Sequence, residues 1–224
     1  LSVDLIYEMP VLQDEEWTQN VQTAIDLQIP HLSCYALTVE PKTALDNFIR
    51  TKKYPPIDND KAAHQFELLM DWLSAAGYEH YEISNFAKPM FYSKHNSSYW
   101  QGISYLGIGP SAHSFNGTSR QWNIANNIFY IKSINENIIP FEKEILTPVM
   151  QLNEYIMTSL RTDKGCDLKI VNEKFGKAES EKLKAESEKF LQQGKMIFQN
   201  NHLVLTKQGK LFADGIAAEL FEIN

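Results

Sequence analysis

The sequence predicts an α/β protein in two parts, and two patterns support this fold class. Apolar residues alternate with polar ones in 3–7 and 32–36, and an amphipathic helical pattern lies between them, which predicts a strand, helix, strand unit. Later in the chain, three helical patterns precede a short β-ribbon, which is the order of elements in a winged helix. We therefore expect one domain over 1–145 and a small winged-helix-like α+β domain over 146–224.

The first part can be justified element by element. The opening strand, 3–7, ends before Pro10. A helix follows, because the acidic run 14–16 suits a helix N-terminus and apolar residues then recur at helical spacing until Pro30. The second strand, 32–36, comes after a crossover long enough for parallel pairing. These elements predict a βαβ unit.

The chain then continues through a second helix into a long polar stretch. Asp58 or Asp60 can cap this helix, and Gly77 fits its C-terminal end. After a short strand over 81–83, residues 84–101 are polar and aromatic, and their length predicts a functional loop.

The remaining elements follow from apolar periodicity and turn residues. We expect a Gly-rich strand and turn over 105–115 and a short helix over 126–134. Two prolines near residues 140–148 mark the domain boundary. The second part is expected to contain three helices, a β-hairpin and a closing helix, over 150–160, 168–175, 182–191, 196–205 and 207–221.

Composition and charge exclude several classes of protein. The 224 residues carry a net charge of -7, which argues against general binding of nucleic acid, and residues 150–224 hold 11 basic against 11 acidic side chains. No apolar run is long enough to span a membrane, and the start lacks the pattern of a secretory signal, so we expect a cytoplasmic protein. Cys34 and Cys166 make neither a disulfide framework nor a metal cluster.

The densest group of functional side chains lies in residues 94–100. A neutral imidazole is a good ligand of haem iron, and Tyr and Trp rings pack against a porphyrin face, so His95, Tyr99 and Trp100 predict a site for a flat, iron-bearing ring. Three cations can meet the carboxylates of such a ring: Lys88, Lys94 and Arg120. The residue types alone leave an alternative open, in which His95 and Asn96 turn the backbone and the aromatics fill an edge of the core.

Other polar residues give weaker signals. Gly107-x-Gly109 lacks the third glycine of a dinucleotide fingerprint and instead suits a close backbone approach. No G-x-S-x-G pattern accompanies His113, which disfavours hydrolase chemistry. Asp4 can bind ribose hydroxyls or cap a loop.

Several motifs, taken in order, resemble the later part of radical SAM proteins related to oxygen-independent coproporphyrinogen III oxidase. They are Asp4-Leu5-Ile6-Tyr7-x-x-Pro10, His31-Leu32-Ser33-x-Tyr35-x-Leu37-Thr38-x-Glu40-Pro41 and Gly77-Tyr78-Glu79-His80-Tyr81-Glu82-Ile83-Ser84-Asn85-Phe86-Ala87-Lys88-Pro89. Two further motifs most resemble the haem chaperone branch of this family: His95-Asn96-x-x-Tyr99-Trp100 and Tyr105-Leu106-Gly107-Ile108-Gly109-x-x-Ala112-His113-Ser114. The agreement of several motifs makes a chance match rare.

The resemblance implies a fold and a set of binding residues. Residues 1–145 would be the later portion of a partial (β/α) TIM-like barrel, followed by the winged-helix-like domain. The residues implied in haem binding are His95 as the iron ligand, with Asn96, Tyr99 and Trp100. Those implied to lie near S-adenosylmethionine are Asp4, Thr38, Gly107, Gly109 and His113.

The chain also departs from the family pattern. The family's C-x-x-x-C-x-x-C motif, which holds a [4Fe-4S] cluster, has no counterpart here, so S-adenosylmethionine and the cluster are expected in the full-length protein and not in this fragment. We expect the chain alone not to cleave S-adenosylmethionine. Glu8 and Met9 stand where the family usually has Gly and Leu. A barrel that lacks its first strands would expose a sheet edge, which predicts self-association.

These observations favour a haem-binding, chaperone-like protein that passes haem to an acceptor protein. The alternative is a coproporphyrinogen III oxidase of porphyrin biosynthesis, a radical SAM oxidoreductase. A third class, a nucleic-acid-binding winged helix, is disfavoured by the balanced charge of residues 150–224. No residue receives a catalytic role from the sequence.

Overall fold

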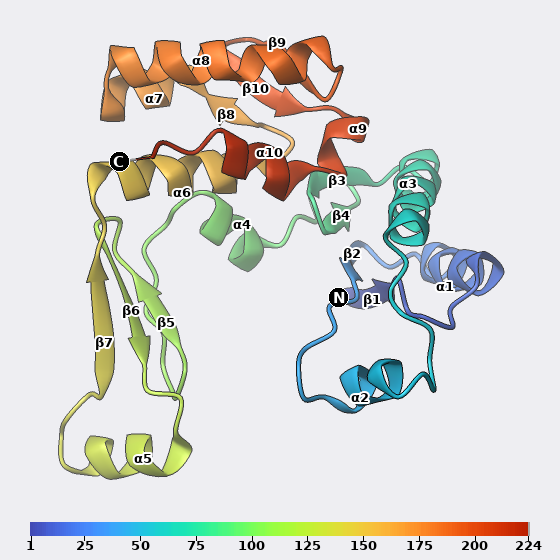
Figure 1. The fold of residues 1–224 in the computed structure, drawn as a ribbon, viewed down its shortest axis with the longest axis horizontal. Coiled ribbons are helices and arrows are strands. Elements are labelled where there is room, and N and C mark those ends of the chain that lie inside the picture. Colours follow the sequence, from blue (N-terminus) through green and yellow to red (C-terminus); the bar gives the residue numbers. More distant parts are fainter. Residues whose placement is uncertain (224) are drawn as a thin grey trace. The chain divides into compact units, whose positions relative to one another are not determined.

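The computed structural model describes residues 1–223, which form two compact units (Figure 1). The first unit contains Leu1–Ser93 and Leu205–Ala213, and the second contains Lys94–Val204 and the residues from Asp214 on. Both units combine helices with sheets, so the α/β class is confirmed. Compactness divides the chain at residue 94, and the sequence-based boundary at residue 145 stays a prediction.

The predicted βαβ unit opens the first unit. It consists of β1 (Val3–Tyr7), α1 (Asp14–Asp26) and β2 (His31–Ala36). The two strands are parallel, with Val3 opposite Leu32 and Tyr7 opposite Ala36. The unit continues with α2 (Ala44–Arg50), α3 (Asn59–Ala75), β3 (Glu79–Glu82) and β4 (Asn85–Ala87). The sheet order is β1-β2-β4-β3, so β1 lies at an edge.

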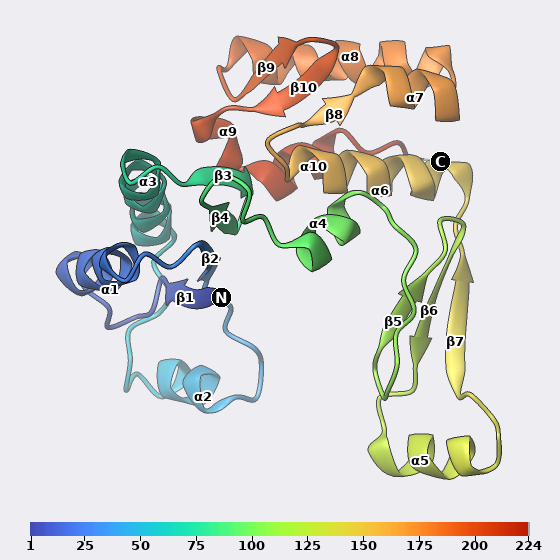
Figure 2. The ribbon, with the colours of Figure 1, turned by 180° about the vertical axis from the view of Figure 1, so that it is seen from behind.

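Helices α1 and α3 and the sheet together form the hydrophobic core of this unit. Figures 1 and 2 show both helices beside β1 and β2. Trp17 of α1 and Leu69 of α3 are fully buried, and the Trp17 indole N–H donates to the Gln65 carbonyl at 3.2 Å. The Asp58 carboxylate caps α3 by accepting from two backbone N–H groups, as expected.

The second unit begins with a short helix and an antiparallel sheet. These elements are α4 (Lys94–Trp100), β5 (His113–Phe115), β6 (Ser119–Asn123), α5 (Asn127–Asn135) and β7 (Phe141–Ile145). The sheet order is β5-β6-β7. Helix α5 lies at the end of this sheet that is farther from α6 (Pro148–Leu160), the helix that follows β7 (Figure 1).

The rest of the second unit has the element order expected for a winged helix. It contains α6 (Pro148–Leu160), β8 (Cys166–Asp167), α7 (Leu168–Phe175), α8 (Lys177–Gln192), β9 (Met196–Gln199) and β10 (His202–Leu205). The sheet order is β8-β10-β9. Asn200 and Asn201 join the last two strands with φ angles of 48° and 66°, the left-handed conformation that tight hairpins require. Two short helices follow: α9 (Lys207–Lys210), which belongs to the first unit, and α10 (Ala213–Glu219), most of which belongs to the second.

Three expectations about the elements were wrong. The predicted loop 84–101 contains β4 and α4. Within 105–115 the predicted turn is present, with Gly109 at a φ of 107°, but the predicted strand is limited to a single bridge between Tyr105 and Phe115 and to β5. The predicted closing helix 207–221 is interrupted between α9 and α10, where Leu211 packs against the core of the first unit.

Within residues 1–223, the helices are too short or too polar to cross a lipid bilayer.

Candidate functional site

The short helix α4 presents the imidazole on which the predicted site depends. His95 and Tyr99 are one helical turn apart and therefore lie on the same face. The Tyr99 hydroxyl and His95 Nε2 share a hydrogen bond of 3.2 Å, and the two rings meet edge to face with centroids 5.1 Å apart. His95 is exposed, so its imidazole is accessible to a ligand, and Asn96 beside it is half-buried.

A row of aromatic rings continues inward from Tyr99. The Tyr99 and Tyr105 centroids are 4.9 Å apart, with the rings close to perpendicular, and those of Tyr105 and Phe115 are 6.1 Å apart. Paired backbone hydrogen bonds of 2.9 and 3.0 Å between Tyr105 and Phe115 fix this arrangement. The row gives one wall of the site a large apolar and polarisable surface.

This row lines a cavity of about 720 Å³ within the second unit, a volume typical of a small-molecule site. The lining residues come from α4, the segment around β5, α6 and α7: Tyr99, Trp100, Gln101, Gly102, Tyr105, Phe115, Gly117, Gln151, Glu154, Tyr155, Thr158, Ile170, Lys174 and Phe175. We call it the aromatic cavity. The Arg161 guanidinium lies 5.0 Å from the Trp100 ring centroid and stabilises the indole in place.

Charged groups lie at one side of the aromatic cavity. Glu154 accepts a hydrogen bond from Arg120 Nη2 at 2.5 Å, so this carboxylate is neutralised. Burial raises the pKa of Tyr105, and the nearby Arg120 partly opposes that rise, so the phenol stays protonated at neutral pH.

The three predicted cations have different surroundings. Lys88 belongs to the first unit, where its ammonium donates to the Ala76 carbonyl and lies 4.2 Å from the Tyr78 ring centroid. Lys94 is exposed at the start of α4, and Arg120 is engaged by Glu154.

The residues implied near S-adenosylmethionine come from both compact units. Asp4 is the second residue of β1, level with Ser33, whereas Thr38 follows the far end of β2. The structure therefore places these two residues at opposite ends of a parallel strand pair. Gly107, Gly109 and His113 belong to the other compact unit.

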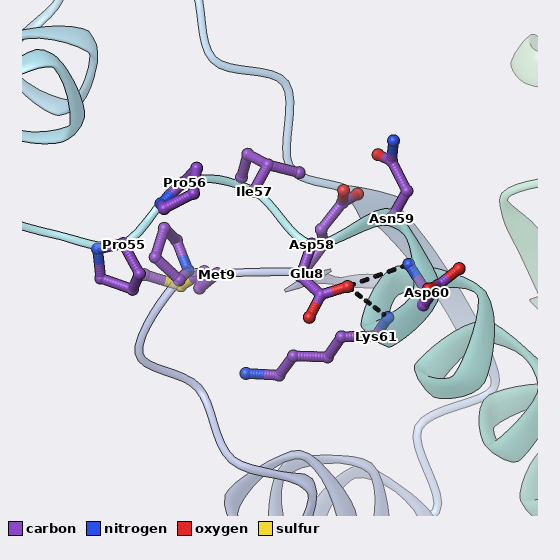
Figure 3. Close-up of a pocket in the computed structure, with 10 residues that line it drawn as sticks. Glu8, Met9, Pro55, Pro56, Ile57, Asp58, Asn59, Asp60 and Lys61 are labelled. Carbon is purple, nitrogen blue, oxygen red and sulfur yellow. Dashed lines mark hydrogen bonds between the residues drawn. The ribbon is translucent and has the colours of Figure 1, made fainter.

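Glu8 occupies a turn that suits glycine. Its φ is 67°, in the left-handed region, and the side chain is buried beside a cavity of about 650 Å³ lined by residues 55–61 (Figure 3). Burial raises the pKa of the Glu8 carboxyl, and the Asp58 carboxylate raises it further. Figure 3 shows Asp58 accepting from the N–H groups of Asp60 and Lys61. A side chain thus fills space that a glycine would leave open.

The Gly107 to His113 segment is a turn in which several backbone groups are hydrogen-bonded within the protein. The Asn123 amide donates to the carbonyls of Gly107 and Gly109 at 3.4 and 2.9 Å, and Gly107 N–H donates to Ser114 Oγ at 3.0 Å. The exposed His113 borders a separate cavity of about 490 Å³.

The two cysteines do not suit an iron–sulfur cluster. Cys34 and Cys166 are both buried, and burial raises the pKa of each thiol to about 12, so both are protonated at neutral pH. Residues 1–223 contain no group of three or more His, Cys, Asp or Glu side chains placed to hold a metal ion.

Sequence reasoning missed the half of the aromatic cavity that comes from α6 and α7. Tyr155 and Phe175 have centroids 6.5 Å apart, and both lie more than 50 residues after α4. Their positions on helices that contribute to the core gave no separate signal, because an aromatic on an amphipathic helix is usually a packing residue. Only the tertiary fold brings them beside the aromatic row.

Comparisons with known proteins bear on the whole chain. A family model described as the HemN C-terminal domain matches residues 146–212. The haem chaperone HemW of Mycobacterium tuberculosis (strain H37Rv) is 33% identical over 221 residues, which are 98% of this chain and 55% of that protein. The HemW of Bacillus subtilis is 30% identical over 96% of this chain and 57% of its own length. The chain thus spans about half the length of these curated relatives.

A solved structure shares the fold. The coproporphyrinogen III oxidase HemN from Escherichia coli, described as a radical SAM enzyme, matches with a TM-score of 0.77 over 98% of this chain and 54% of its own. The sequence identity is 18%, so this likeness concerns the fold alone.

Proposed function

Since this chain belongs to the protein family that includes the haem chaperone HemW, we propose that it binds haem in the aromatic cavity and that the longer protein passes haem to an acceptor protein. The observation that carries the proposal is the position of His95 and Tyr99 on one face of α4, with Tyr99 also lining the aromatic cavity. In this proposal the iron is reached by the exposed imidazole, and the ring packs against aromatic walls.

Each residue of the predicted haem motif has a role in this proposal. His95 supplies the iron ligand, after its Nε2 leaves the 3.2 Å hydrogen bond with the Tyr99 hydroxyl. Tyr99 and Trp100 line the aromatic cavity, and Asn96, next to His95 on α4, is proposed to contact the bound haem. The aromatic row supports a planar ligand, because offset and edge contacts with flat rings are favourable.

The wider context is also a proposal. Residues 1–145 would form the later portion of a partial (β/α) TIM-like barrel, and residues 146–224 would form a winged-helix-like domain. S-adenosylmethionine and a [4Fe-4S] cluster would belong to the complete protein, in which Asp4, Thr38, Gly107, Gly109 and His113 would lie near the former. We place the protein in the cytoplasm, and we expect porphyrins besides haem to bind the aromatic cavity.

The alternative function, oxidation of coproporphyrinogen III in porphyrin biosynthesis, has support from the HemN fold. We favour the chaperone because the chain is 30–33% identical in sequence to haem chaperones over nearly its whole length, whereas its sequence identity to HemN is 18%. Anaerobic incubation of the chain with S-adenosylmethionine, iron, sulfide and a reductant should yield no 5′-deoxyadenosine. A stoichiometric yield would contradict the expectation that cleavage needs the family's cluster cysteines, which this chain lacks.

A haemin titration tests the proposed function directly. The purified chain should give a saturable Soret shift, and His95→Ala should weaken haemin binding at least about tenfold, or about 1.4 kcal/mol, because the iron loses its ligand. His64→Ala is the matched control, since it removes another exposed imidazole, in the first unit, and should leave the affinity unchanged. Equal affinity of the His95→Ala protein and the unsubstituted chain would remove His95 from this role.

A further inference from the structure

The aromatic cavity contains a single cationic side chain among its lining residues, the ammonium of Lys174. We propose that Lys174 is a positioning residue that binds a carboxylate of haem and so directs the carboxylate edge of the ring toward α7. This inference rests on the proposed function and adds the orientation of the ligand, for which the haem motif itself contains no residue.

Lys174 is well placed on its helix for this task. It lies in the last turn of α7, and Ile170, one turn earlier on the same face, also lines the aromatic cavity, as does the adjacent Phe175. This face of α7 therefore offers an apolar wall that ends in a positive charge. Haem has the matching distribution, an apolar ring with carboxylates along one edge.

The charge of Lys174 is also available. Two neighbouring lysines form salt bridges with a glutamate one helical turn later: Lys169 with Glu173 at 3.8 Å and Lys177 with Glu181 at 3.3 Å. In the described part of the chain, no ion pair includes Lys174. Lys174 is exposed, so its ammonium needs little desolvation to meet a carboxylate at the opening.

The other charged groups at the aromatic cavity leave this role to Lys174. Glu154 would repel a ligand carboxylate, but Arg120 neutralises it at 2.5 Å, and the same contact engages the Arg120 guanidinium. The cavity therefore presents one neutralised carboxylate and one unpaired ammonium. A ring with carboxylates along one edge is therefore stabilised when that edge faces Lys174, and it gains no such attraction when the edge faces the other way.

The experiment compares haemin with haemin dimethyl ester, which keeps the ring and the iron but lacks the negative charges. Lys174→Gln should weaken haemin binding about three- to tenfold and change ester binding less than about twofold, since only haemin carries the carboxylate partner. Lys174→Arg should restore the haemin affinity. Lys132→Gln is the matched control, because Lys132 also lies exposed in the last turn of its helix, α5, away from the aromatic cavity.

The outcomes separate this inference from the proposed function. Selective loss for haemin, restored by Lys174→Arg and diminished at high salt, supports the inference. If haemin and ester binding fall equally, or neither falls, Lys174 has no such role, although the cavity still binds haem. If the unsubstituted chain binds neither compound, both the proposed function and the inference are contradicted.

Discussion

Exposure decides which histidines of this chain can reach a ligand. His95 is exposed on α4 at the rim of an aromatic row, whereas His80 is enclosed. The His80 ring stacks on Phe86 with centroids 4.0 Å apart, meets Phe66 edge to face, and bonds through Nε2 to the Ile83 carbonyl at 2.9 Å. The same residue type is thus proposed to bind a ligand in one unit and packs against aromatic rings in the other.

The enclosed His80 predicts a pH dependence of stability. Burial lowers its pKa from 6.5 to about 3, with Lys210 contributing, so His80 is neutral in the folded chain. The unfolded chain binds this proton first, so stability is lost as pH falls from about 6.5 to about 3, at about 1.4 kcal/mol per pH unit from this group. Urea unfolding at several pH values should show a shallower dependence for His80→Phe, which keeps an aromatic ring between Phe66 and Phe86.

The control for this prediction is His64→Gln, which removes an exposed imidazole and should leave the pH slope as it is in the unsubstituted chain. His31, whose pKa burial also lowers, remains in every variant and accounts for a residual slope. An unchanged slope in the His80→Phe protein would mean that the pKa of His80 is the same in the folded and unfolded chains, which contradicts the prediction.

At the scale of elements, the turn before β5 depends on the absence of a side chain at Gly107. A Cβ there would lie 2.1 Å from the His113 carbonyl oxygen, so Gly107→Ala should lower the free energy of unfolding by about 1–3 kcal/mol. Gly215→Ala is the matched substitution, because a Cβ at Gly215 in α10 meets nothing within 4 Å and should stabilise the helix by up to about 1 kcal/mol. Denaturant midpoints measure both; equal effects would show that the backbones at Gly107 and His113 are not in close contact.

The sequence predicted the elements that have strong local signals. Alternation identified β1 and β2, and helical periodicity with caps identified α1, α3, α6 and α7 close to their observed bounds. The elements it missed are short or largely polar, so no apolar period marks them: α2, β4, α4, β6, β7 and β8. These segments are fixed by pairing with distant strands, as β4 is between β2 and β3.

The candidate site was predictable in part for the same reason. His95, Tyr99 and Trp100 lie within one short motif, whereas Lys174, Tyr155 and Phe175 join them only through the packing of α6 and α7 beside the aromatic row. A local motif can predict a ligand class, but it contains no information about cavity walls contributed by other elements. The orientation of a bound ring therefore becomes a question only once the fold is known.

At the scale of the whole molecule, one side of β1 has no partner strand in the described part of the chain. An unpaired edge offers backbone donors and acceptors to a second chain, so we expect concentration-dependent association in light-scattering measurements. Ile6→Lys, at a residue of β1 that is 49% exposed, should suppress it, and Ile128→Lys, on α5, should not. A monomer whose β1 amides all resist hydrogen exchange would contradict an open edge.

The central claim is that the His95 imidazole binds haem iron at the rim of the aromatic cavity, and pulsed electron paramagnetic resonance tests it most directly. In the ferric 1:1 haemin complex of chain labelled with [15N]histidine, we predict a strong coupling between the iron and one imidazole nitrogen, and its loss in His95→Ala protein loaded with the same amount of haemin. The same coupling in both proteins, or its absence from the unsubstituted chain, would contradict the account.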